Sequence, residues 1–171
     1  PFKNTILSSI LKKRINQIKL VNKTPLETQQ RNFEYLLNKG KNTKFGSEHF
    51  FKTINGYTDF VDKIPVRNYE ELFPYIEEMR SGGKNILWPG ETKLFAKSSG
   101  TTNAKSKFIP LSKDALHNCH YKGGKDMLAL YLNNNNNSKF FNGKGVIIGG
   151  SQNIGAKFID GDLSAILLSN F

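Results

Sequence analysis

The stretch FAKSSGTTNAKSKFIP, residues 95–110, constrains the fold more than any other part of the chain. Two short apolar segments, residues 93–96 and 108–109, flank a polar loop, and this pattern predicts two strands that the loop connects. The loop holds one glycine, Gly100, between hydroxyl side chains, which belong to Ser98, Ser99, Thr101 and Thr102. A chain that joins strands through such a loop must position many hydrogen-bond donors at one end of a sheet.

The composition of this loop suits phosphate groups. Backbone N–H groups of a glycine-containing turn and hydroxyl side chains donate short hydrogen bonds, and Lys105 and Lys107 add positive charge. The loop is not a Walker motif, because no second glycine stands directly before a lysine within it. It does not follow the dinucleotide fingerprint G-x-G-x-x-G either. From the residues alone, a phosphate-binding loop and a polar surface hairpin are equally good interpretations.

Helical periodicity alternates with short apolar runs along the chain, which predicts an α/β fold. We expect helices near 4–20, 25–40, 54–64, 69–80, 112–131 and 161–168, and a further buried strand at 145–150. The expected organisation is a single partial domain over 1–171, mainly helical at 1–90 and α/β at 91–171, with the phosphate loop at 98–107.

The start of the helix at 69–80 has a specific signal. Asn68 can accept a hydrogen bond from the backbone of Glu71, whose side chain can return one to the backbone of Asn68. Pro74 lies inside this helix and predicts a kink.

The formal net charge of +11 is unevenly distributed. Residues 1–50 hold ten Lys/Arg and three Glu, residues 51–100 hold seven of each sign, and residues 101–171 hold eight Lys and four Asp. A nucleic-acid binder usually interleaves basic residues with exposed aromatics or gathers them on one helix, whereas this excess is spread along the N-terminal third, so we expect no nucleic-acid partner. No apolar run is long enough to span a bilayer, and the single cysteine, Cys119, fits a reducing compartment. A cytoplasmic protein without stable membrane insertion is expected.

Other polar residues are weaker candidates for function. His117, Cys119 and His120 lack a further ligand at the next helical turn, so no metal site is expected. Lys122 and Lys125 could face a carboxylate but are better read as solvated, and residues 149–151 could line a pocket at a strand end. The chain begins with Pro1 and stops inside the apolar run LSAILLSNF, so we expect a fragment of a longer protein.

The stretch SSGTTNAKSKFIP resembles the first core motif of adenylate-forming enzymes, and most closely that of the GH-three (Gretchen Hagen, auxin-responsive) acyl acid–amido synthetases. Much of 25–115, including FGSEHFFKTINGYTDFVDKIPVRNYEELFPYIEEMRSGGKNILWPGETKLFAKSSGTT, resembles the segment before that motif in the family. The resemblance implies the N-terminal portion of the large domain of an adenylate-forming, luciferase-like enzyme. The rest of that domain and the C-terminal domain would lie outside this chain.

The resemblance also implies an activity. ATP and a carboxylic acid would give an acyl-adenylate, which an amine or amino acid would convert to an amide, with Mg²⁺ bridging the phosphates. By this likeness Ser98, Ser99, Gly100, Thr101 and Thr102 would hold the ATP phosphates, and Lys107 would be the catalytic residue that stabilises the departing pyrophosphate. Asn103 and Ala104 stand where many family loops have glycine, which predicts a stiffer loop.

Two further core motifs of the superfamily, for adenine and for ribose, are expected to lie outside this chain. The fragment alone is therefore expected to be inactive, as part of a truncated enzyme or as a degenerate relative. Two other functions stay open: an acyl-CoA ligase that uses a thiol acceptor, and a non-catalytic basic module that binds nucleic acid or an anionic membrane. The residues do not identify the acid, the amine or the oligomeric state.

Overall fold

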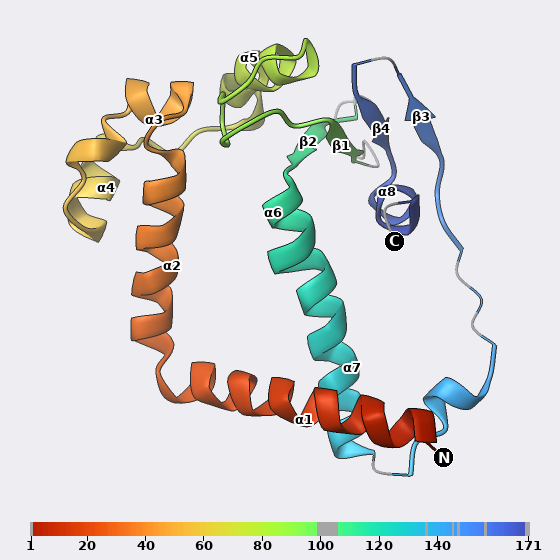
Figure 1. Cartoon of the computed structure of the whole chain (residues 1–171). Helices are drawn as coiled ribbons and strands as arrows, with labels where there is room; N and C mark the ends of the chain where they lie inside the picture. Colours follow the sequence, from red (N-terminus) through yellow and green to blue (C-terminus); the bar gives the residue numbers. More distant parts are fainter. Residues whose placement is uncertain are drawn as a thin grey trace. The chain divides into compact units, whose positions relative to one another are not determined.

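A computed structural model describes residues 2–98, 106–135, 137–144, 146, 148–155 and 157–169 of the chain (Figure 1). The chain divides into two compact units. The helical unit comprises Pro1–Arg31 and Asp114–Ile148, and the sheet unit comprises Asn32–Lys113 and Gly149–Phe171. The change from a helical to an α/β region that the sequence predicts near residue 90 coincides with no boundary of these units. The single partial domain over 1–171 remains an expectation from the sequence.

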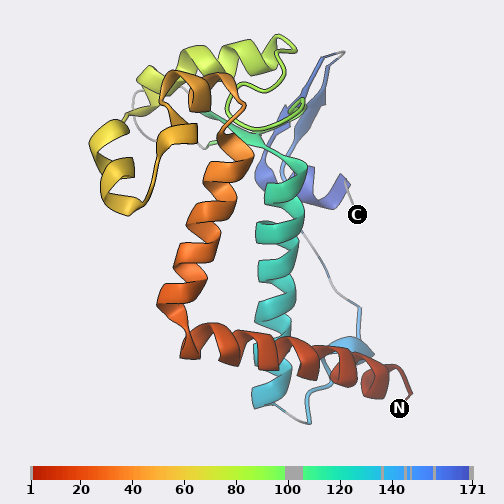
Figure 2. The same ribbon diagram turned by 60° about the vertical axis from the view of Figure 1, so that its left-hand side comes forward.

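The helical unit is built on two long helices. α1 (Phe2–Lys23) crosses α7 (Lys122–Asn134), as Figures 1 and 2 both show. The Arg14 guanidinium of α1 holds both carboxylate oxygens of Asp126 on α7, with Nη2 2.6 Å from Oδ2. This hydrogen-bonded ion pair lowers the pKa of the Asp126 carboxyl. Among the described residues, no helix is both long enough and apolar enough to cross a membrane.

The helix predicted at 112–131 is present but irregular. It begins as α6 (Lys113–Ala115), continues as the π-helical turn η2 (Leu116–Tyr121) and becomes α7. The three candidate metal ligands His117, Cys119 and His120 all lie in this π-helical turn, which is a rare element that sequence periodicity does not predict. A short 3₁₀ turn, η3 (Phe140–Asn142), follows.

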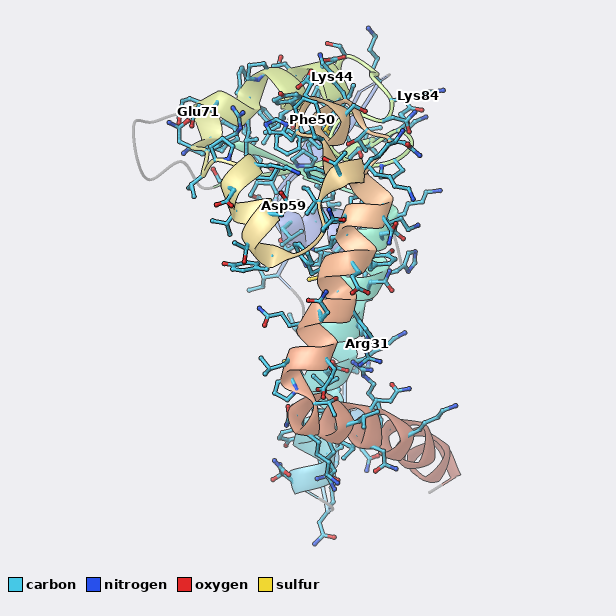
Figure 3. All side chains as sticks on the ribbon, turned by 90° about the vertical axis from the view of Figure 1, so that its left-hand side faces the viewer. Arg31, Lys44, Phe50, Asp59, Glu71 and Lys84 are labelled. Carbon is cyan, nitrogen blue, oxygen red and sulfur yellow. The ribbon has the colours of Figure 1, made fainter. Side chains whose placement is uncertain are left out.

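Aromatic side chains hold the first helices of the sheet unit together. α2 (Pro25–Gly40) is followed by α3 (Lys44–Glu48), the 3₁₀ turn η1 (Phe51–Thr53) and α4 (Tyr57–Lys63). The ring of Phe33 on α2 meets that of Phe60 on α4 edge to face, with centroids 5.4 Å apart. On α4, Asp59, which Figure 3 labels, pairs with Lys63 one turn later. The predicted helices at 25–40 and within 54–64 are confirmed.

α5 (Tyr69–Arg80) starts as predicted. The Asn68 side chain accepts the Glu71 N–H at 2.9 Å, and the Glu71 carboxylate accepts the Asn68 N–H at 2.7 Å (Glu71 is labelled in Figure 3). Farther along the helix, the Tyr75 hydroxyl donates to Glu48 of α3 at 2.5 Å, which raises the pKa of Tyr75. These contacts fix the start and the middle of α5.

The sheet has four short strands, β1 (Leu94–Lys97), β2 (Phe108–Leu111), β3 (Gln152–Ile154) and β4 (Ile159–Gly161), in the order β2-β1-β4-β3. β1 is antiparallel to β2 and parallel to β4, and β3 is antiparallel to β4. The fully buried Phe95 of β1 packs with Ile76 and Met79 of α5 and with Ile86, which forms the core. α8 (Leu163–Ser169) follows β4. The predicted α/β fold class is confirmed.

The prediction of a strand at 145–150 is wrong for the residues of this segment that the structure describes. Val146 and Ile148 are 91% and 92% exposed, and the strand that forms starts later, at Gln152. The Gly150 N–H donates to the Ser164 hydroxyl at 3.0 Å, so it is not available for a strand partner. Apolar composition alone predicted a buried strand, but the described residues of this segment form no strand and the side chains of Val146 and Ile148 are exposed.

Candidate functional site

The base of the 98–107 loop is closed by a pair of hydrogen bonds. The Ser98 N–H donates to the Lys107 carbonyl at 2.9 Å, and the Lys107 N–H donates to the Ser98 hydroxyl oxygen at 2.9 Å. This pair continues the ladder of β1 and β2, whose last registered pair is Lys97 with Phe108. The Ser98 side chain therefore fixes the two ends of the loop to each other.

The remaining predicted phosphate ligands lie outside the described residues. These are Ser99, Gly100, Thr101 and Thr102, and Asn103, Ala104 and Lys105 lie outside with them. Their roles stay predictions from the sequence. The structure describes the two residues that border this stretch in the predicted site, Ser98 and Lys107.

The Lys107 side chain extends beside the start of α5. Its Nζ lies 5.0 Å from the centre of the Tyr69 ring and 3.9 Å from the nearest carboxylate oxygen of Glu70. The Lys107 side chain is 46% exposed, and Glu70 is more exposed still. Such a contact is weak in water, so the ammonium group is available to an anion with several oxygens.

Two residues of α5 that sequence reasoning did not assign to the site contact Phe108, the neighbour of Lys107. The Tyr69 hydroxyl accepts the Phe108 N–H at 2.8 Å. The Arg80 guanidinium carbon lies 3.9 Å from the centre of the Phe108 ring. Contacts across 28 to 39 residues of sequence leave no local signal, so the sequence alone does not place these residues at the site.

The strand register brings other polar residues to the same edge of the sheet. β1 and β4 are parallel, with Ala96 beside Gly161, so their carboxyl ends share one edge. Gly161 also faces Gln152, the first residue of β3, so Ser151 lies at this edge as well. The Asp162 carboxylate accepts the Ser151 N–H at 3.1 Å. Ligands of α/β folds bind beyond the carboxyl ends of strands, which is where the loop base and Ser151 lie.

One sequence expectation needs a correction. The ribose motif was expected outside this chain, but its pattern, aromatic-x-x-Gly-Asp, does occur in residues 158–162. Here Phe158 packs against Phe95 and Arg80, and Asp162 accepts the Ser151 N–H. Phe158 and Asp162, the first and last residues of the pattern, thus have structural partners on the sheet.

The weaker candidates other than residues 149–151 lie in the helical unit. The His117 and Tyr121 rings contact each other at a centroid distance of 5.6 Å, and Cys119 is exposed. Lys122 and Lys125 are exposed on α7. Within the part of the chain that the structure describes, no group of three or more His, Cys, Asp and Glu side chains could hold a metal ion.

Comparison with known proteins defines the family. The model of the GH3 family N-terminal domain matches residues 14–158, and the chain therefore belongs to the GH3 family. The chain is 36% identical over 76 residues to the indole-3-acetic acid-amido synthetase GH3.8 of Oryza sativa subsp. indica, an alignment that covers 42% of this chain and 13% of that protein. It is 26% identical over 106 residues to the jasmonoyl-L-amino acid synthetase JAR4 of Nicotiana attenuata, an alignment that covers 60% of this chain and 18% of that protein.

A solved structure shows the same fold. The GH3.15 acyl acid amido synthetase superposes with a TM-score of 0.77 at 17% sequence identity, over 90% of this chain and 28% of that one. The chain thus spans between about an eighth and about a quarter of the length of these proteins. The fold is that of the N-terminal region of this family of synthetases, as the sequence resemblance implied.

Proposed function

We propose that this chain carries the ATP-phosphate loop of an acyl acid–amido synthetase. The observation that carries the proposal is the closed base of the loop. Ser98 and Lys107 bond to each other at the end of a β1–β2 hairpin, in a chain that belongs to the GH3 family. These two ends of the loop lie at the edge of the sheet where α/β folds bind their ligands.

The residues of the loop fit a triphosphate chemically. Ser99, Thr101 and Thr102 would donate hydroxyl hydrogen bonds to phosphate oxygens, and Gly100 would let the backbone approach closely. The Ser98 hydroxyl accepts the Lys107 N–H, so its own hydrogen is available to a phosphate. Lys107 would stabilise the negative charge that develops on pyrophosphate as it leaves.

Mg²⁺ is the metal ion that this chemistry implies, and it would supply further positive charge at the phosphates. Residues 98–107 contain no carboxylate, so this loop would bind the nucleotide phosphates and leave the ion to other ligands.

The reaction that we propose has two steps. A carboxylate oxygen of the acid attacks the α-phosphorus of ATP, which forms the acyl-adenylate and releases pyrophosphate. An amine then attacks the acyl carbon, which forms the amide and releases AMP. The names of the relatives, an indole-3-acetic acid-amido synthetase and a jasmonoyl-amino acid synthetase, favour an amino acid over a thiol as acceptor.

ATP–pyrophosphate exchange tests this proposal. The assay uses the full-length protein that contains this chain and a panel of carboxylic acids that includes indole-3-acetic and jasmonic acid. We expect acid-dependent exchange, and we expect Lys107→Ala to lower it by about a hundredfold or more because the developing charge loses its partner. Lys93→Ala is the matched control, because the Lys93 side chain is 65% exposed and stands before β1.

Two results would reject the proposal. The first is a folded full-length protein that shows no exchange with any acid, which would favour the basic binding module. The second is a Lys107→Ala variant as active as Lys93→Ala. If exchange occurs, analysis of the products with an amino acid or with a thiol distinguishes the amido synthetase from an acyl-CoA ligase.

A further inference from the structure

Phe108 is held from both ends of α5. Tyr69, the first residue of the helix, accepts the Phe108 backbone N–H at 2.8 Å. Arg80, the last residue of the helix, places its guanidinium carbon 3.9 Å from the centre of the Phe108 ring. One helix therefore fixes both the backbone and the side chain of the residue that follows Lys107.

The Tyr69 contact satisfies a backbone group that the sheet leaves unpaired. β2 is an edge strand, and Ser98 and Lys107 form the hydrogen-bonded pair at its start. In an antiparallel ladder the next residue along the strand points its N–H away from the partner strand. The Phe108 N–H consequently faces outward, and the Tyr69 hydroxyl accepts it.

The Arg80 contact carries an energetic cost that stability alone does not explain. The Arg80 guanidinium stacks on Phe108 and lies 4.6 Å from the centre of the Phe158 ring, while its Nη1 is paired with Glu77. Its Nε is buried and has no hydrogen-bond partner among the residues that the structure describes. A buried N–H group without a partner is destabilising, so packing alone would favour an apolar side chain at this position. The planar guanidinium of Arg80 can contact the faces of both rings and so fix the positions of Phe108 and Phe158 relative to each other.

We propose that Tyr69 and Arg80 are positioning residues for Lys107, which they act on through Phe108. The proposal rests on the function proposed above. The backbone of Lys107 is fixed by Ser98 on one side and, through Phe108, by α5 on the other. The ammonium group of Lys107 also lies over the Tyr69 ring, so the same residue limits both the backbone and the side chain. A displacement of about 1 Å in such a group lowers the rate about a hundredfold.

The test compares two tyrosines of the same helix. Tyr69→Phe removes the hydroxyl that accepts the Phe108 N–H and keeps the ring beneath Lys107. Tyr75→Phe is the matched control, because it removes a hydroxyl that bonds to Glu48, on α3. Both variants are made in the full-length protein, and a denaturation midpoint is measured for each.

The first readout is hydrogen–deuterium exchange of the Phe108 amide, which requires no activity. We expect Tyr69→Phe to speed this exchange about tenfold or more, because a freed N–H loses the protection of its hydrogen bond. Tyr75→Phe should leave it unchanged. Unchanged exchange in Tyr69→Phe would overturn the proposal, whatever the enzyme does.

The second readout is ATP–pyrophosphate exchange, with kcat and the KM for ATP determined separately. We expect Tyr69→Phe to lower kcat about tenfold with little change in KM, because a misplaced Lys107 loses contact mainly with the charge that forms in the transition state. Arg80→Met should lower kcat as well, and Arg80→Lys should not restore it, since lysine keeps the charge without the planar stack. If both tyrosine variants lose the same amount of kcat, and the loss only parallels the fall in their denaturation midpoints, a positioning role would be rejected. A wild-type protein without pyrophosphate exchange would reject the proposed function, while the amide readout still decides whether α5 holds Phe108.

Discussion

Different side-chain contacts hold the described parts of the two units together. The sheet unit buries Phe95 completely among Ile76, Met79 and Ile86, and pairs of aromatic rings link its helices. In the described part of the helical unit, an Arg14–Asp126 ion pair joins α1 to α7, and the buried side chains are Ile15, Leu116 and Ala129. The residues of the helical unit include eleven Lys/Arg and three Asp/Glu, whereas those of the sheet unit include fourteen and eleven. Apolar burial is insensitive to pH, so the core around Phe95 should tolerate acid conditions that weaken the Arg14–Asp126 pair.

The largest expected effect comes from Phe95→Ala. Removal of this fully buried ring leaves a cavity beneath β1 and should lower the free energy of unfolding by about 3–5 kcal/mol. Urea denaturation measures the loss, and hydrogen exchange locates it. We expect amides of β1, β2 and α5 to lose protection while α1 and α7 keep theirs. Equal loss in both units would show that they unfold as one and that the contrast between them has no energetic meaning.

Gly46→Ala should have the next largest effect. A Cβ at residue 46 would lie 2.1 Å from the Gly40 carbonyl oxygen, a backbone atom that cannot move aside cheaply. We expect a loss of about 1–3 kcal/mol, measured by urea denaturation, because the start of α3 must shift away from the end of α2. A variant as stable as the wild type would mean that these two helix ends are less tightly packed than the core of the sheet unit.

The ion pair of the helical unit predicts a dependence on pH. Arg14 lowers the pKa of Asp126 in the folded state, chiefly through their hydrogen bonds. The carboxylate therefore stabilises the fold above its unfolded pKa of about 3.9, and this contribution disappears as the pH falls through the lower folded value. Asp126→Asn should cost about 1–2 kcal/mol at pH 7 and progressively less below pH 4.

Urea denaturation at pH 7 and at a pH below 4 measures the coupling between the two residues. The variants compared are Asp126→Asn, Arg14→Gln and the double variant. A double variant whose loss equals the sum of the single losses would show that the two groups do not interact in solution. If the difference in unfolding free energy between the wild type and Asp126→Asn stays constant at all pH values, the lowered pKa of Asp126 is contradicted.

The smallest expected effect is a gain. Gly124 lies in the first turns of α7, and a Cβ there would meet no atom within 4 Å. Gly124→Ala should raise the free energy of unfolding by about 0.5–1 kcal/mol, because alanine loses less conformational freedom in a helix. Opposite signs for Gly46→Ala and Gly124→Ala, measured in the same denaturation series, would separate a packed glycine from an exposed one.

Local chemistry in the sequence predicted much of the fold. The Asn68–Glu71 capping box and the strands on both sides of the loop were predicted because each depends on neighbouring residues. The strand at 145–150 was wrong because its apolar residues suggested burial that the fold does not provide. For the site, Ser98 and Lys107 were predicted from one loop of the sequence, and their roles stay predictions. The sequence did not identify Tyr69 or Arg80, because only the packing of α5 along β2 brings them to Phe108.

The order of the strands also has a consequence for how the loop forms during folding. β1 and β2 are separated by ten residues, whereas the parallel partner of β1, β4, begins at Ile159, after a long helical excursion. A short loop closes at a much smaller cost in chain entropy than a segment of that length, and the hairpin can form first. As the chain is synthesised, α5, β1 and β2 are all complete before β4 exists. The hairpin that holds Ser98 and Lys107 can thus assemble on α5 and act as the template on which the rest of the sheet is added.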